Sequence, residues 1–275
     1  MRIKFLIIVA LSLLVSKNFI GQKNEKKIEK IFIAEYSPSR SGIILRADVF
    51  NKKQSSVQKF DEQNNLLEYF ELNSSTKKIR NLYKYFYNQD QIVTLIEVYN
   101  NENELTSYTK QIINSFDKID TSYTYLASKE LSGIQIYNYD INNNLINRID
   151  SSFKYNRTLK WRYEYNSLNE MTKLMAYDKY GLLRDTRNYK YNESGQEYES
   201  NLIKANGEFT FFKSKYNENG DLTDNIWYNK EGVIKSHTKF KYLYDEYGNW
   251  LTKVRSRDEE EPNYIWERKI EYYNR

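Results

Sequence analysis

The chain has 275 residues, a formal net charge of +5, 27 tyrosines and a mean hydropathy of −0.84. It has no cysteine, which excludes disulfides, thiolate catalysis, cysteine-based zinc sites and a lipid anchor on cysteine. Acidic and basic residues are interspersed, whereas nucleic-acid binding depends on a clustered basic stripe, so we expect no nucleic-acid partner.

The N-terminus has the pattern of a secretory signal peptide. Residues 1–4 include the basic residues Arg2 and Lys4, and residues 5–15 form an apolar or small-residue run that is too short for a membrane span of roughly 20 residues. We expect a signal peptide over 1–21, and hence a protein that is secreted, periplasmic or at the cell surface and not integral to a membrane after cleavage. A buried N-terminal helix or an uncleaved anchor is the alternative.

Residues 22–58 precede the repeats. They begin with a charged stretch that predicts a leader, followed by apolar triplets at 31–33 and 43–45 that predict extra or capping strands.

From residue 59 to 275 one motif recurs: an aromatic residue, Asp or Asn, two polar residues, Gly or Asn, any residue, and a hydrophobe. Copies recur about every 26 residues, and a second series is offset by half a period, which predicts two turns and two strands per repeat. The clearest copies place their aromatic, Asx and glycine residues at Tyr177, Asp178 and Gly181; Tyr216, Asn217 and Gly220; Tyr228, Asn229 and Gly232; and Tyr244, Asp245 and Gly248.

The motif has the chemistry of a tight turn. Its Asp or Asn can accept hydrogen bonds from backbone amides two residues on, and its glycine can adopt positive φ. Asparagine tolerates the same conformation. In the weaker copies we assign the glycine place to Asn65, Asn103, Asn144 and Asn169.

Between the turns, aromatic residues alternate with polar residues at a period of two, which is typical of strands. Neighbouring strands would align the rings in cross-strand ladders. We therefore expect an all-β, repetitive antiparallel hairpin meander, in the form of an extended twisted sheet or a short β-superhelix. Its terminal strands would have unpaired edges, which favours dimerisation through an edge.

The copy Tyr244-Asp-Glu-Tyr-Gly-Asn-Trp250 resembles the YD repeats of Rhs-type proteins, with Trp250 in place of the usual leucine. The resemblance spans about residues 60–275. A MORN-like meander is the nearest alternative. Long YD arrays form a spiralling sheet that can close around cargo, but this chain has far fewer copies and no recognisable toxin domain, so we expect an open sheet.

The leading functional prediction is a non-catalytic scaffold or binding protein of the cell envelope, without a cofactor or a metal. Its candidate ligands are carbohydrate or an envelope protein, bound through exposed aromatic residues. The candidate binding residues are Trp161, Trp227, Trp250 and Trp266.

Packing within the ladders is the plainer interpretation of these tryptophans. A glycoside hydrolase that uses two carboxylates, and a toxin-associated or immunity partner, are the alternative functions. The single histidine, His237, is expected on a strand surface.

Overall fold

The computed structural model describes residues 26–41, 44–73, 76, 78–258 and 262–274. The predicted signal peptide lies outside the described residues. Every described element is a β-strand, so the all-β prediction is confirmed. Within the described residues, no helix has the length and apolar character needed to span a membrane.

The first nine strands run in sequence order around the structure. Their bounds are β1 Ile28–Ser41, β2 Ile44–Phe60, β3 Leu66–Leu72, β4 Ile79–Tyr87, β5 Val93–Tyr99, β6 Leu105–Ile113, β7 Ile119–Leu126, β8 Leu131–Tyr139 and β9 Leu145–Ser152.

The second nine strands complete the structure. Their bounds are β10 Arg157–Tyr165, β11 Met171–Tyr177, β12 Leu183–Tyr191, β13 Glu197–Lys204, β14 Phe209–Tyr216, β15 Leu222–Tyr228, β16 Ile234–Tyr244, β17 Trp250–Arg257 and β18 Tyr264–Tyr272.

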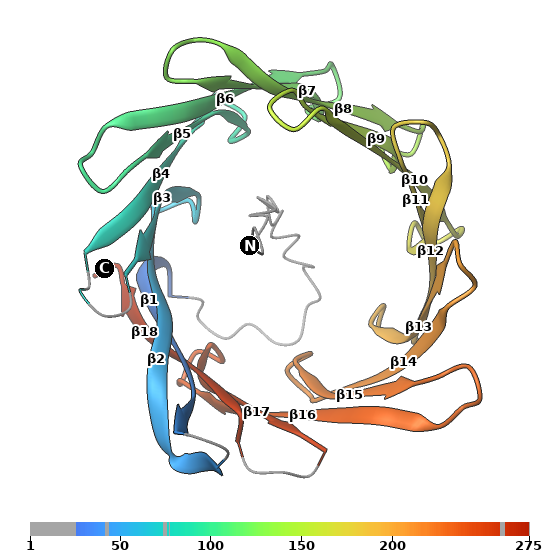
Figure 1. The fold of residues 1–275 in the computed structure, drawn as a ribbon. Coiled ribbons are helices and arrows are strands. Elements are labelled where there is room, and N and C mark those ends of the chain that lie inside the picture. The colour runs from blue at the N-terminus through green and yellow to red at the C-terminus, as the bar shows by residue number, and fades with distance from the viewer. Residues whose placement is uncertain (1–25, 42–43, 74–75, 77, 259–261, 275) are drawn as a thin grey trace.

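The sheet is closed. Each strand pairs antiparallel with its neighbours in sequence, and β1 also pairs with β18, where Ile31 lies opposite Ile270 and Ile33 opposite Arg268. Figure 1 shows the ring, and the pairings place β1 between β18 and β2. Strands spaced by about 4.8 Å and tilted by about 40° would give eighteen of them a backbone diameter of roughly 35 Å.

Closure overturns the open twisted sheet or superhelix that the sequence predicted. The segment expected to be a leader with capping strands contains β1 and most of β2, and β1 bridges the two ends of the array. Since each of the eighteen described strands has two hydrogen-bonded neighbours, no strand is left at an edge, and closure removes the basis for the proposed edge-strand dimerisation.

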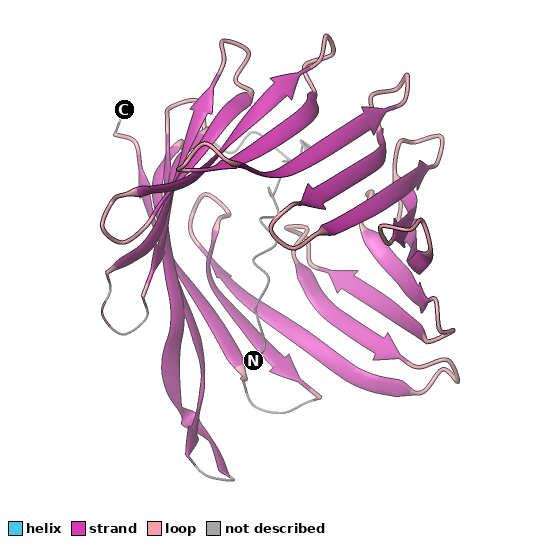
Figure 2. Ribbon diagram, turned by 45° about the horizontal axis from the view of Figure 1, so that its top comes forward, coloured by secondary structure: helices cyan, strands magenta, loops and turns pink. Residues whose placement is uncertain are grey.

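The turns that follow the even-numbered strands belong to the first series of the motif and all lie at one end of the barrel. The turns of the second series follow odd-numbered strands and lie at the other end (Figure 2). In the turn after β8, the amide of Asn143 donates to the carbonyl of Asp140 at 3.0 Å. The Oδ1 atom of Asp140 accepts from the amides of Asn142 and Asn144 at 2.9 and 2.8 Å. Gly181, Gly220, Gly232 and Gly248 have positive φ at the equivalent place.

Two turn assignments were wrong by one residue. Asn64 and Asn143 have positive φ, rather than Asn65 and Asn144, whereas Asn103 and Asn169 have it as expected. The fifth place of the motif, counted from Phe60 or from Tyr139, falls on Asn64 or Asn143. In each pair of adjacent asparagines, the first takes the left-handed conformation.

A repeated tyrosine hydrogen bond ties neighbouring hairpins together. The hydroxyl of a tyrosine near the end of one strand donates to a backbone carbonyl about 20 residues earlier. Examples are Tyr165 to Leu145 and Tyr242 to Leu222, both at 2.9 Å. The other copies begin at Tyr87, Tyr139, Tyr191 and Tyr216. Tyr273 makes the same type of bond across the closure of the ring, to the carbonyl of Phe60, 213 residues earlier.

Candidate functional site: the lumen face of the barrel

The wall of the barrel is one sheet thick, and its two faces can be told apart by strand register and burial. Directly paired residues share a face, so the ladders can be followed around the ring from Tyr83 and Tyr69. Burial is the first cause that raises the pKa of the tyrosines on this face: Tyr69, Tyr83, Tyr85, Tyr87, Tyr137, Tyr139, Tyr163, Tyr165, Tyr189, Tyr191, Tyr216, Tyr242, Tyr244, Tyr264 and Tyr272.

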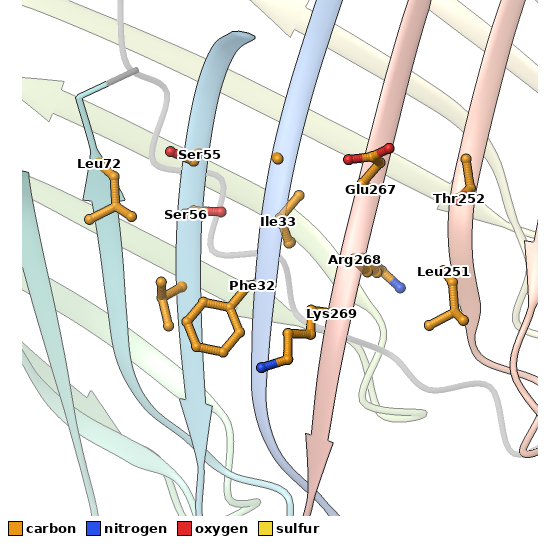
Figure 3. Close-up of a pocket in the computed structure, with 12 residues that line it drawn as sticks. Phe32, Ile33, Ser55, Ser56, Leu72, Leu251, Thr252, Glu267, Arg268 and Lys269 are labelled. Carbon is orange, nitrogen blue, oxygen red and sulfur yellow. The ribbon is translucent and has the colours of Figure 1, made fainter. Parts of the chain in front are cut away.

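This tyrosine face is the inner face. All described strands belong to the ring, so no second layer covers its convex side, and only the concave side is crowded by the rest of the wall. Figure 3 agrees: with the far wall behind the strands, Phe32 and Lys269 point toward the viewer, and both belong to the opposite face by register.

The outer face is charged along the middle of its strands. Ion pairs join neighbouring strands on it, including Lys59 with Glu68 at 2.7 Å and Lys190 with Glu199 at 2.6 Å. His237 lies on this face, with Nε2 at 2.8 Å from Oδ1 of Asp224. Lys173 with Glu164 and Lys30 with Glu271 are further cross-strand pairs on this face.

All four tryptophans selected from the sequence lie on the inner face. Trp161, Trp227 and Trp266 have inner-face register positions, opposite Arg148, Ser236 and Lys253 respectively. Trp250 follows a bulge, and the guanidinium of the inner-face residue Arg268 lies 3.4 Å from its ring centroid. The strand alternation that suggested these residues therefore places them along one continuous surface.

The wall formed by β16, β17 and β18 contains a basic cluster, which we define as Lys253, Arg255 and Arg268. Lys253 lies directly opposite Tyr242 on β16 and Trp266 on β18. Its Nζ atom is 5.4 Å from each of these two ring centroids. The β17 cation thus lies between two aromatic strands.

The other two members of the basic cluster have similar surroundings. Arg255 lies opposite Phe240 and Tyr264, and its guanidinium is 5.1 Å from the centroid of the Tyr264 ring. Its Nε donates to Asn263 Oδ1 at 2.8 Å. The Nε of Arg268 is buried and has no hydrogen-bond acceptor.

Burial is the first cause that lowers the pKa of each cation in the basic cluster, and for Arg268 it lowers the pKa to about 10. The positive charge of Arg268 also lowers the pKa of Lys253, and Arg257 does the same to Arg255. The carboxylate of Asp221 opposes the shift at Lys253 and Arg268. Burial and mutual repulsion therefore both disfavour these charges.

The wall formed by β8, β9 and β10 has a related arrangement with a different charge balance. Arg148 lies 5.7 Å from the Tyr137 ring centroid and 5.1 Å from that of Trp161. It also forms two hydrogen bonds with Asp150, from Nε at 2.7 Å and from Nη2 at 2.5 Å. The charge of Arg148 is therefore balanced by a neighbour on its own strand.

Three inner-face carboxylates already have donors in the wall. Asp150 is paired with Arg148, Glu35 accepts from the Tyr264 hydroxyl at 2.6 Å, and Glu71 accepts from Asn81 at 2.7 Å. Within the described ranges, no group of three or more His, Asp or Glu side chains could hold a metal ion. Glycoside hydrolysis stays an untested prediction.

Two depressions mark the wall near β17. One of about 470 Å³ is shown in Figure 3 and is lined mostly by outer-face residues such as Phe32 and Lys269, together with inner-face residues that include Arg268. The other, of about 280 Å³, is lined mainly by inner-face side chains, including Asn225, Thr238 and Arg255. The inner depression adjoins the basic cluster because Arg255 belongs to both.

No protein-family model matches the sequence, and no curated protein matches it. A porin-like protein from Bacteroides uniformis is 8% identical, with a TM-score of 0.48, over 89% of this chain and 96% of that one. A porin-like protein from Bacteroides vulgatus is 10% identical, with a TM-score of 0.35, over 90% and 99% of the two chains. These values support no inference about activity.

The TcdB2-TccC3 structure is 11% identical, with a TM-score of 0.41. The match covers 81% of this chain but only 14% of that one. The resemblance to YD repeats stays a prediction from the sequence motif.

The basic cluster was not predicted from the sequence. A usable signal was present, since Lys253 and Arg255 alternate along one strand at the same period as the aromatic pairs Phe240 and Tyr242 on the strand before. Register, which local alternation does not give, was needed to place cations opposite rings.

Proposed function

We propose that this chain is an exported, non-catalytic binding protein whose barrel stands in water and takes a carbohydrate into its lumen. The observation that carries the proposal is the position of the four tryptophans on the inner face, in a ring wide enough to leave an open interior. Tryptophan and tyrosine rings present flat apolar surfaces with a polar rim, which suits stacking on sugar rings.

The charge of the outer face is the reason for proposing a barrel in water. A membrane-spanning β-barrel needs an outward apolar band about 25 Å tall, and charges within it are costly. Here Lys84, Lys110 and Lys173 occupy outer positions within their strands. The cross-strand ion pairs described above share that face, so charged side chains interrupt the apolar residues that lipid would contact.

The test is equilibrium binding of soluble oligosaccharides to the mature protein, followed by tryptophan fluorescence and calorimetry. We expect saturable binding that Trp161→Ala and Trp266→Ala each weaken at least tenfold, because each substitution removes a stacking surface. Tyr125→Ala is the matched control, since Tyr125 stacks on Tyr108 on the outer face, with ring centroids 5.1 Å apart.

Equal weakening by the outer-face and inner-face variants, or no saccharide binding, would contradict the lumen proposal. The claim that the barrel stands in water is tested separately by flotation with phospholipid vesicles. We expect the protein to stay in the aqueous fraction without detergent, and insertion into the vesicles would exclude it.

A further inference from the structure

The geometry of β16, β17 and β18 points to recognition of a negatively charged group in the lumen, and we propose that the ligand is an acidic saccharide carrying carboxylate or sulfate groups. This inference rests on the proposed function and specifies its ligand class. The basic cluster would bind the anion, and the adjoining rings would bind the sugar that carries it.

The first support is the absence of a direct counter-charge. Among the ion pairs formed by the described residues, none involves Lys253, Arg255 or Arg268, and the Nε of Arg268 is buried without an acceptor. The three cations are half-buried, and charges that lose part of their hydration are normally paired or hydrogen-bonded in compensation. An anionic ligand would supply the missing partner.

The second support is the arrangement of rings around the cations. Tyr264 and Trp266 lie with centroids 4.4 Å apart, directly opposite Arg255 and Lys253. A ligand here would meet a charged donor and an aromatic face on adjacent strands. Guanidinium groups bind carboxylate and sulfate-like oxygens through paired donors, which adds orientation to the charge attraction.

The third support is space beside the cluster. The inner depression of about 280 Å³ is lined by Arg255 and Arg257 together with the polar side chains of Asn225 and Thr238. These side chains can hydrogen-bond to hydroxyl groups, whereas the two guanidinium groups favour an anion. Charge, aromatic surface and polar donors thus meet on one part of the inner face.

Comparison with the wall formed by β8, β9 and β10 indicates that unpaired cations beside aromatic rings are specific to one side of the barrel. Arg148 also lies against two aromatic rings, but Asp150 neutralises it. If the cations served only to pack against aromatic side chains, we would expect the same charge pairing on both walls. The absence of a paired acid at the basic cluster is the distinguishing feature.

The experiment compares neutral dextran oligomers with sulfated dextran oligomers, and methyl-esterified with free oligogalacturonate, using the full mature chain. We expect at least one acidic series to bind at least tenfold tighter than its neutral counterpart, with a preference that weakens as salt is raised. Which acidic series binds tighter distinguishes sulfate from carboxylate recognition. Failure of both acidic series to exceed their neutral partners overturns the inference.

Three variants locate the effect. Lys253→Met and Arg268→Met each remove a charge and keep an unbranched apolar side chain, and each should reduce the acidic preference at least fivefold. Arg148→Met is the matched control and should change it less than twofold. Equal losses in all three variants would contradict recognition by the basic cluster.

A readout without saccharide, using sulfate as the anion, covers the case in which the protein binds neither of the tested sugar backbones. We expect sodium sulfate to raise the melting temperature of the wild type more than sodium chloride at equal ionic strength. Part of that difference is the general stabilisation that sulfate gives through exclusion from protein surfaces, so Lys253→Met should reduce the difference below its value in Arg148→Met without abolishing it. An unchanged difference in the variant contradicts the inference. Binding of neutral sugars that is lost with Trp266→Ala, without any acidic preference, would retain the proposed function and exclude this refinement.

Discussion

The walls around β9 and β17 lie eight strands apart in an eighteen-stranded ring, and they use the same aromatic framework with a different charge balance. At β9, Arg148 packs against Tyr137 and Trp161 and is neutralised by Asp150. At β17, Lys253 packs against Tyr242 and Trp266 without a paired acid. The comparison indicates that aromatic packing builds the wall, and that the charge left over at one side is available for binding.

The largest expected effect is on alkaline stability, and it should be common to both walls. Burial raises the pKa of Tyr163 on β10 and of Tyr264 on β18 to about 12, from an ordinary value of 10.0. Unfolded tyrosine ionises first, so the stabilisation is complete below about pH 10 and is lost as the pH rises through 12. Other inner tyrosines with a pKa of about 12 add to this loss: Tyr83, Tyr85, Tyr87, Tyr139 and Tyr191.

The measurement is urea unfolding of wild type, Tyr163→Phe and Tyr264→Phe at pH 8 and pH 11. Each substitution should cost less free energy at pH 11 than at pH 8, because the wild-type tyrosine loses stabilisation when it ionises in the unfolded state and phenylalanine has no hydroxyl to ionise. If the cost were independent of pH at only one of the two walls, the walls would not share the same framework of buried tyrosines.

The next effect should differ in sign between the walls. Arg148→Met leaves Asp150 unpaired at a site where the two side chains are 27% and 24% exposed, and it should lower the free energy of unfolding by about 1–2 kcal/mol. Arg268→Met removes a desolvated cation that lacks a paired acid, and it should raise that free energy by about 1 kcal/mol. Urea unfolding at pH 7 measures both changes in the free energy of unfolding.

The Arg268 contribution also has a predicted pH dependence. Folding lowers its pKa from the ordinary value of an arginine to about 10, so the destabilisation is fully present below pH 10 and fades as the pH rises above it. The advantage of Arg268→Met should therefore shrink above pH 10. If both arginine variants were destabilised equally, the charge difference between the walls would be refuted.

A smaller and equal effect is expected from the tyrosine hydrogen bonds. Tyr165→Phe and Tyr242→Phe each remove the donor to a carbonyl, at Leu145 and Leu222, and each should cost about 1 kcal/mol. Thermal unfolding followed by circular dichroism measures both. Costs that differ by more than about 1 kcal/mol would show that the framework is not uniform.

The smallest effect concerns the turns that precede β11 and β17. Asn169 has a φ of 60° and Gly248 a φ of 83° at the same place in the motif. Asn169→Gly and Gly248→Asn should each change stability by no more than about 0.5 kcal/mol, because both residue types tolerate this conformation. Gly248→Val should cost clearly more, and the absence of that contrast would contradict the turn geometry.

Local chemistry made the turns and faces predictable, because an Asx residue followed by a left-handed glycine reverses the chain within a few residues. The alternation of Tyr163 and Tyr165 likewise placed them on one face. Closure was not predictable in this way. It depends on Ile31 meeting Ile270 and on Ile33 meeting Arg268, pairings that link distant segments and leave no local spacing to read.

The candidate site was partly predictable for the same reason. Alternation placed Trp161 and Trp266 on strands, but a period of two identifies two faces without showing which one is concave. The basic cluster needed register as well, since Lys253 becomes significant only when it lies opposite Trp266. Sequence therefore indicated the aromatic residues and missed the cations between them.

The pairing of β1 with β18 has a consequence for how the molecule is made. Ile31 and Ile270 are neighbours in the sheet, so the last seam cannot form until both ends of this stretch have been synthesised. Until then a growing hairpin array exposes unsatisfied backbone groups at its margins, where intermediates of β-rich proteins associate wrongly. Sealing is therefore a late event in folding, and shielding of the growing chain by a chaperone would act before it.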